Sequence, residues 1–121
     1  MAEAATIAER YIALWNEADP VRRHDLLAAE WSEDATYADP LARASGHAEI
    51  DTLIGAVQQR FPGFRFTLVG TADGVGDRVR SSWALGPEAQ PDMIMGTDFV
   101  LVENGRLKSV TGFLDKVPAH G

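Results

Sequence analysis

The chain has 121 residues, 45% of them hydrophobic and 24% charged, and this size and composition fit a single globular domain spanning residues 1–121. It contains no cysteine, which excludes disulfide bonds, thiolate nucleophiles and Cys-ligated zinc or iron–sulfur sites. Its 18 acidic and 11 basic residues give a net charge of −7 without a basic cluster, so we expect no nucleic-acid partner.

The N-terminal segment shows no sign of a targeting or membrane-spanning sequence. It has no basic stretch followed by an unbroken apolar run, and no part of the chain approaches the roughly 18 consecutive apolar residues of a membrane span. We therefore expect no membrane association and a cytoplasmic location.

Three helices are predicted in the first half of the chain. Residues 3–18 place apolar side chains on one helical face, namely Ile7, Tyr11, Leu14, Trp15 and Ala18. Asp19-Pro20 is typical of a helix start, and this second helix is expected to end near Glu30. A third helix, with Gly46 as its N-cap, is expected to run to Pro62-Gly63. Between the last two, residues 35–38 predict a short strand and residues 41–45 a loop.

The second half of the chain has the alternating pattern of strands. The predicted strands cover residues 64–69, 78–85, 93–102 and 106–115, with turn signals at Asp73-Gly74, Gly76-Asp77 and Asn104-Gly105. Residues 118–121 are expected to fray. Helices followed by antiparallel strands predict an α+β fold, in which three N-terminal helices pack on one face of a strongly curved, mainly antiparallel sheet and enclose a pocket.

Asp98 is a candidate functional residue because it lies in the middle of a predicted strand. If Ile94 and Val100, which share its parity, face the core, its carboxyl group is buried and without a counter-charge stays neutral at pH 7. In the other parity Met95 and Phe99 face the core and Asp98 faces solvent. The pattern does not choose between the two.

Asp39 and the two tyrosines are the other polar candidates. Asp39 precedes a proline and fits an ordinary turn, but Tyr37 lies two residues before it and points the same way on an extended segment. Tyr11 lies on the apolar face of the first helix, where a core tyrosine is as common as a catalytic one. No two histidines have ligand spacing, and no Gly-rich loop follows a strand and opens a helix, so we expect neither a metal site nor a cofactor.

Several segments together resemble the nuclear transport factor 2-like superfamily. They are residues 10–16 (RYIALWN), 31–40 (WSEDATYADP), 46–50 (GHAEI), 96–99 (GTDF), 104–106 (NGR) and 112–115 (GFLD). Within it the chain is similar to SnoaL-like polyketide cyclases and to ketosteroid isomerases. The resemblance implies a cone-shaped, cystatin-like fold and a homodimer formed through the outer face of the sheet.

The resemblance to the isomerases extends to three residues. It implies that Asp39 is the catalytic base, and that Tyr11 and a protonated Asp98 form the oxyanion hole. The expected function is acid/base proton transfer next to a carbonyl, of the isomerase or cyclase type, on an apolar cyclic or polyketide- or steroid-like molecule. The expected walls of the substrate pocket are Trp15, Tyr37, Phe61, Phe64, Trp83, Met95 and Phe113.

Two other functions are open on the sequence alone. The same fold can serve as a non-catalytic module that binds a small hydrophobic molecule or dimerises. It can also serve as a hydrolase or dehydratase in which Asp39 or Asp98 activates water.

Overall fold

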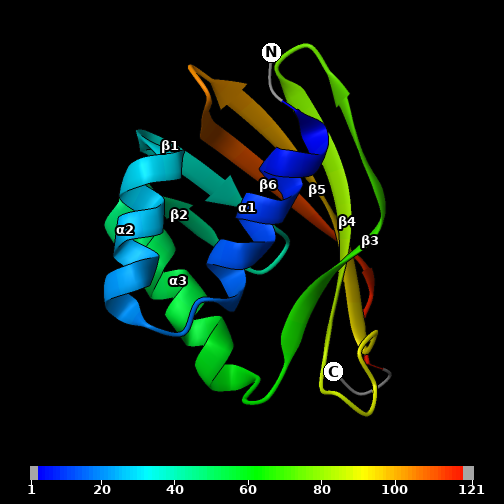
Figure 1. Cartoon of the computed structure of the whole chain (residues 1–121). Helices are drawn as coiled ribbons and strands as arrows, with labels where there is room; N and C mark the ends of the chain where they lie inside the picture. The colour runs from blue at the N-terminus through cyan, green and yellow to red at the C-terminus, as the bar shows by residue number, and fades with distance from the viewer. Residues whose placement is uncertain (1–2, 119–121) are drawn as a thin grey trace.

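A six-stranded sheet bends around three helices, which all lie on one of its faces (Figure 1). The computed structural model describes residues 3–118. Its elements in chain order are α1 (Ala4–Asn16), α2 (Pro20–Glu30), β1 (Trp31–Ala38), β2 (Arg43–Ser45), α3 (Gly46–Arg60), β3 (Arg65–Val75), β4 (Arg78–Gly86), β5 (Ile94–Glu103) and β6 (Arg106–Lys116). The predicted α+β class is confirmed. The tail beyond residue 118, expected to fray, lies outside the described residues.

The sheet is mixed and curved but not closed. Its strand order is β2-β1-β6-β5-β4-β3, and every neighbouring pair is antiparallel except β1 and β6, which are parallel. In the hairpin between β5 and β6, Asn104 and Gly105 both have positive φ, as the predicted tight turn requires. None of the helices within residues 3–118 is long and apolar enough to cross a lipid bilayer.

Several boundaries differ from the sequence-based prediction. β1 begins at Trp31 instead of residue 35, and its pairing with β6 shifts between Trp31 and Thr36, which lets the polar residues between them stay in the strand. Residues 43–45, predicted as loop, form β2 because they pair with the end of β1, and this pairing buries the side chain of Ala44. Gly46 is the first residue of α3 and not its cap; the N-cap is Ser45, whose backbone N–H donates to Glu49 Oε1 at 2.9 Å.

The C-terminal end of α1 is tied to the edge of the sheet. α1 ends at Asn16, two residues earlier than predicted, because Glu17 has an extended backbone conformation. The Asn16 side chain bonds to the backbone of Phe66 in β3. Its Nδ2 donates to the Phe66 carbonyl at 2.9 Å, and the Phe66 N–H donates to its Oδ1 at 2.8 Å. This pair of bonds covers part of the exposed edge of β3 and fixes α1 over the sheet.

The core lies between the helices and the inner face of the sheet, the face they cover. α1 packs on β3 and β4, and α3 packs on β1 and β2. The residues that are almost completely buried include Leu14, Leu27, Trp31, Ile50, Ile54, Leu107 and Val110. These side chains come from every helix and from β1 and β6, and buried residues of β3, β4 and β5 join the same cluster, so the core is continuous.

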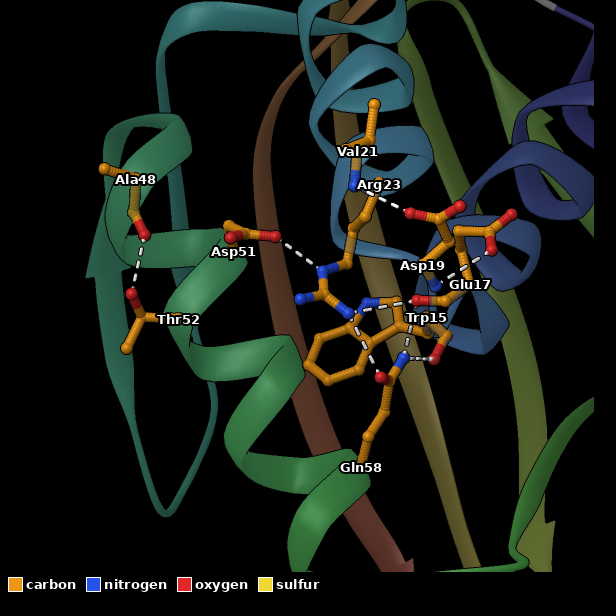
Figure 2. Close-up of polar contacts among 9 residues, drawn as sticks. All are labelled: Trp15, Glu17, Asp19, Val21, Arg23, Ala48, Asp51, Thr52 and Gln58. Carbon is orange, nitrogen blue, oxygen red and sulfur yellow. Dashed lines mark hydrogen bonds and ion pairs between the residues drawn. The ribbon is translucent and has the colours of Figure 1, made fainter.

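A buried arginine joins the three helices (Figure 2). Arg23 in α2 is only 6% exposed, and its Nε donates to Asp51 Oδ1 of α3 at 2.5 Å. Its Nη1 donates to the Glu17 carbonyl at the end of α1 at 3.0 Å and to Gln58 Oε1 at 3.1 Å. Gln58 in turn donates to the carbonyls of Trp15 and Glu17. The network holds the C-terminal end of α1, and therefore Trp15, in place.

Replacing Arg23 by Met is expected to lower the free energy of unfolding by roughly 2–3 kcal/mol, because the Asp51 carboxylate, the Glu17 carbonyl and the Gln58 side-chain oxygen each lose a donor. Urea unfolding of the variant measures this loss. The matched control is Arg22→Met, since Arg22 is exposed and its ion pair with Asp19 is 3.9 Å long; a change within about 0.5 kcal/mol is expected there. Equal losses for the two variants would contradict the structural role of the network.

Candidate active site

A cavity of about 450 Å³ lies between the inner face of the sheet, α1 and the C-terminal half of α3. This volume is in the range of small-molecule sites. Aromatic and aliphatic side chains form most of its wall, and the carboxyl groups of Asp39 and Asp98 are the acidic groups among its lining residues.

The sequence left open whether Asp98 faces the core or solvent, and in the structure it faces the core. Asp98 is 1% exposed and lies on the inner face of β5, together with Ile94 and Val100. Phe99, on the opposite face, is 47% exposed. Within the described residues, Asp98 Oδ2 has no hydrogen-bond partner. A buried carboxylate oxygen without a donor is unfavourable, and a protonated carboxyl group has no charge to desolvate.

Burial raises the pKa of Asp98 from its ordinary value of 3.8 to about 7. The nearby Tyr11 hydroxyl and Trp83 indole favour the anion and oppose this rise in pKa, while the negative charges of Asp39 and Asp115 add to it. Tyr11 is itself 3% exposed, and burial followed by the charge of Asp98 raises the pKa of its hydroxyl well above 10. Tyr11 therefore remains a hydrogen-bond donor at neutral pH.

Asp39 occupies a different environment, at the turn after β1. Its Oδ1 accepts the backbone N–H groups of Leu41 and Ala42, both at 2.8 Å, and its Oδ2 accepts the hydroxyl of Tyr37 at 2.6 Å. The turn geometry expected from Asp39-Pro40 and the pairing with Tyr37 are thus both present. These three hydrogen bonds hold the carboxyl group of Asp39 in one orientation. Burial, followed by this bond to Asp39, raises the pKa of Tyr37 and keeps it a donor.

Gly112 in β6 brings the two acids together, and sequence reasoning assigned it no role in the site. Gly112 is the register partner of Asp98. A Cβ atom on it would lie 2.6 Å from Asp98 Oδ1 and 3.4 Å from Asp39 Cβ. The missing side chain therefore leaves the space that the Asp98 carboxyl group occupies beside Asp39. A glycine inside a strand indicates that another group approaches the backbone closely, but the sequence does not identify that group.

Five of the seven residues predicted as walls line the cavity: Trp15, Tyr37, Phe61, Trp83 and Phe113. The ring of Phe113, however, lies against Phe99 on the outer face, with 5.9 Å between ring centroids. Phe64 and Met95 are not among the lining residues. Met95 has the opposite parity to Asp98, and Phe64 packs on Phe61 beside a smaller hollow.

Several lining residues were not predicted: Phe66, Leu85, Ile94, Leu114 and the basic residue Arg60. Side chains alternate between the two faces of a strand, so the apolar lining residues on the strands could have been predicted once Asp98 was known to face the core. Among residues 3–118, no three His, Asp or Glu side chains are grouped so that they could hold a metal ion.

The pKa of Asp98 predicts how stability depends on pH. Between the unfolded value near 3.8 and about 7, the folded protein holds a proton that the unfolded chain has released, so stability falls as pH rises through this window. Relative to Asp98→Asn, wild-type unfolding free energy should decrease by about 1.4 kcal/mol per pH unit between roughly pH 4.5 and 6.5. Urea unfolding across this range measures the difference, with Asp92→Asn on the surface as control. Parallel curves for wild type and Asp98→Asn would contradict the assignment.

Comparison with known proteins identifies the family of the chain. Residues 8–110 match the model of the SnoaL-like domain family. A solved structure from Agrobacterium tumefaciens strain C58, described as a candidate isomerase of the SnoaL-like family, is 44% identical; the match covers 95% of this chain and 99% of that one, with a TM-score of 0.90. No curated protein matches the sequence.

More distant structures share the fold. A candidate ketosteroid isomerase from Kribbella flavida is 24% identical, with a TM-score of 0.70 over 94% of this chain and 78% of that one. A candidate polyketide cyclase from Sinorhizobium meliloti is 16% identical, with a TM-score of 0.71 over 88% of this chain and 93% of that one. With a family match over most of its length and a close structural relative in the same family, the chain belongs to the SnoaL-like family of the nuclear transport factor 2-like fold.

Proposed function

We propose that this protein catalyses proton transfer next to a carbonyl group of an apolar cyclic, polyketide-like or steroid-like molecule, as an isomerase or cyclase. Asp39 is the base, and Tyr11 and neutral Asp98 donate hydrogen bonds to the developing enolate oxygen. One observation carries the proposal. Two carboxyl groups meet at Gly112 in one cavity, where burial raises the pKa of Asp98 while three hydrogen-bond donors orient Asp39.

The hydrogen bonds of Asp39 leave it one site for a proton. A carboxylate has about four lone-pair positions, and Leu41, Ala42 and Tyr37 occupy three of them. The remaining position is on Oδ2, and Asp39 lines the cavity. The three donors also fix the orientation of the carboxylate, so that it need not be ordered when substrate binds.

The reaction then proceeds through an enolate. The α-proton of the substrate moves to Asp39 Oδ2, and the electron pair of the C–H bond moves toward the carbonyl oxygen. Tyr11 and Asp98 stabilise the resulting charge in a cavity walled by aromatic rings, where water competes little for their hydrogen bonds. In an isomerase Asp39 returns the proton to another carbon. In a cyclase the enolate carbon attacks a second carbonyl, a C–C bond forms, and the new alkoxide takes the proton.

A binding protein without catalysis is the second candidate, and one observation favours it. The bonds of Asp39 to Leu41 and Ala42 belong to an ordinary turn, and such a turn needs no catalytic role for its aspartate. The two functions differ in what happens when Asp39 loses its basicity but keeps its shape.

Asp39→Asn should retain the fold and the affinity for ligands, because an amide can accept the two backbone N–H bonds. It should lower the rate of isomerisation of a β,γ-unsaturated cyclic ketone to its conjugated isomer by roughly 10²–10⁴-fold, the range for a positioned general base. Ultraviolet absorbance of the conjugated product gives the rate. Asp77→Asn, at an exposed turn, is the control. Equal rates for Asp39→Asn and wild type would remove Asp39 from the mechanism.

Gly112→Ala tests the geometry of the two acids. The added Cβ must displace the Asp98 carboxyl group, since it would otherwise lie 2.6 Å from Oδ1. A displacement of this kind is expected to lower the isomerisation rate by up to roughly 10²-fold. The control is Thr111→Ala, one residue earlier on the outer face. A rate unchanged in Gly112→Ala but reduced in Thr111→Ala would refute the proposed role of Asp98.

A further inference from the structure

Arg60 is the only cation among the described residues that line the cavity. It is the last residue of α3, and its guanidinium lies over the ring of Phe61, 5.7 Å from the ring centroid. Within residues 3–118 no carboxylate forms an ion pair with it. Arg43, Arg65 and Arg106 share that property, but none of them lines this cavity. Arg60 is thus a positive charge that the protein's own acids leave free at the site.

The cavity changes character from its floor to its rim. Tyr11 and Asp98, at the floor, are almost completely buried. Arg60 is exposed, and so are Leu41 and Val117, which are 83% and 55% exposed and also line the cavity. The wall between these ends is mainly aromatic and aliphatic. A ligand whose oxygen reaches Tyr11 and Asp98 therefore presents its other end to the rim, where Arg60 lies.

The charges of the cavity also favour one orientation of a ligand that carries a negative charge. The carboxyl group of Asp39 lies beside Asp98 at Gly112 and repels a second anion there, whereas Arg60 attracts one at the rim. Contact with the Phe61 ring holds the guanidinium in place before a ligand binds. An arginine fork of this kind matches the geometry of a carboxylate, with two parallel N–H···O bonds.

We propose that the substrate is an amphiphilic acid, with an apolar ring system, a carbonyl group at one end and a carboxylate at the other that Arg60 binds at the rim. This inference rests on the proposed function, because Tyr11 and Asp98 must take the carbonyl end for the carboxylate to reach Arg60. It adds a recognition element that the proton-transfer chemistry itself does not require.

The test uses two matched series of probes. The first consists of ω-(6-hydroxynaphthalen-2-yl)alkanoic acids with one to four methylene groups, and the second of the corresponding primary carboxamides. The naphthol oxygen stands in for the enolate at the floor, and the spacer lets the acid reach the rim. Isothermal titration calorimetry gives the dissociation constants. For the acid of optimal length, we expect about threefold to tenfold tighter binding than for its amide.

Variants of Arg60 and a matched arginine separate recognition from stability. In Arg60→Gln the preference for acid over amide should disappear, while the affinity for the amides stays unchanged. In Arg65→Gln, five residues along the chain and exposed, the preference should persist. In wild type the preference should shrink as NaCl is raised from 50 to 500 mM, because salt screens an ion pair at the rim.

The outcomes distinguish this inference from the proposed function. Amide binding with no preference for the acids, or a preference that survives Arg60→Gln, would overturn the role of Arg60 and leave the proposed function standing. Absence of binding by both series would overturn both proposals, because the floor would then not accept a phenol oxygen.

Discussion

The side chain of Asp98 lies on the inner face of β5, where the helices close over the sheet and where, among the described residues, no cation forms an ion pair with it. Ionising a carboxyl group in such a place is costly, so its proton is retained to a pH far above the ordinary range. A neutral acid beside Tyr11 gives the cavity floor two hydrogen-bond donors and no net charge of its own. The environment of this one group therefore decides which chemistry the cavity can support: stabilisation of a developing oxyanion.

The rest of the fold holds the partners of Asp98 at fixed positions. The two bonds between Asn16 and Phe66 fix the end of α1, the helix that carries Tyr11. On the opposite side, three hydrogen bonds hold Asp39 in the turn after β1. Gly112 of β6 has no side chain, which leaves room for the carboxyl group of Asp98 beside Asp39. Both acids are thus positioned by hydrogen-bonded elements and not by a flexible loop, as a site that depends on orientation requires.

Local patterns predicted the helices and the long strands, since each has a clear period, but β3 continues to Val75 through Asp73-Gly74, which was predicted as a turn. They did not predict β2, whose three residues become a strand only because β1 lies beside them. For the site, apolar residues on both faces of β5 made the parity of Asp98 ambiguous; Met95 was placed on the wrong face for the same reason. Gly112 and Arg60 could not be recognised, because a close approach and the rim of a cavity are properties of packed elements and not of a segment.

The claim on which the account rests is that Asp98 keeps its proton up to about pH 7 while it faces a cavity that also contains the carboxyl group of Asp39. A carboxyl-carbon NMR titration of selectively labelled protein, with the Asp98 resonance assigned by its loss in Asp98→Asn, measures this directly. The account predicts a midpoint of about 7 for Asp98. A midpoint near 3.8, the ordinary value for an aspartate, would contradict it, because Asp98 would then be an anion and could not donate a hydrogen bond to an enolate.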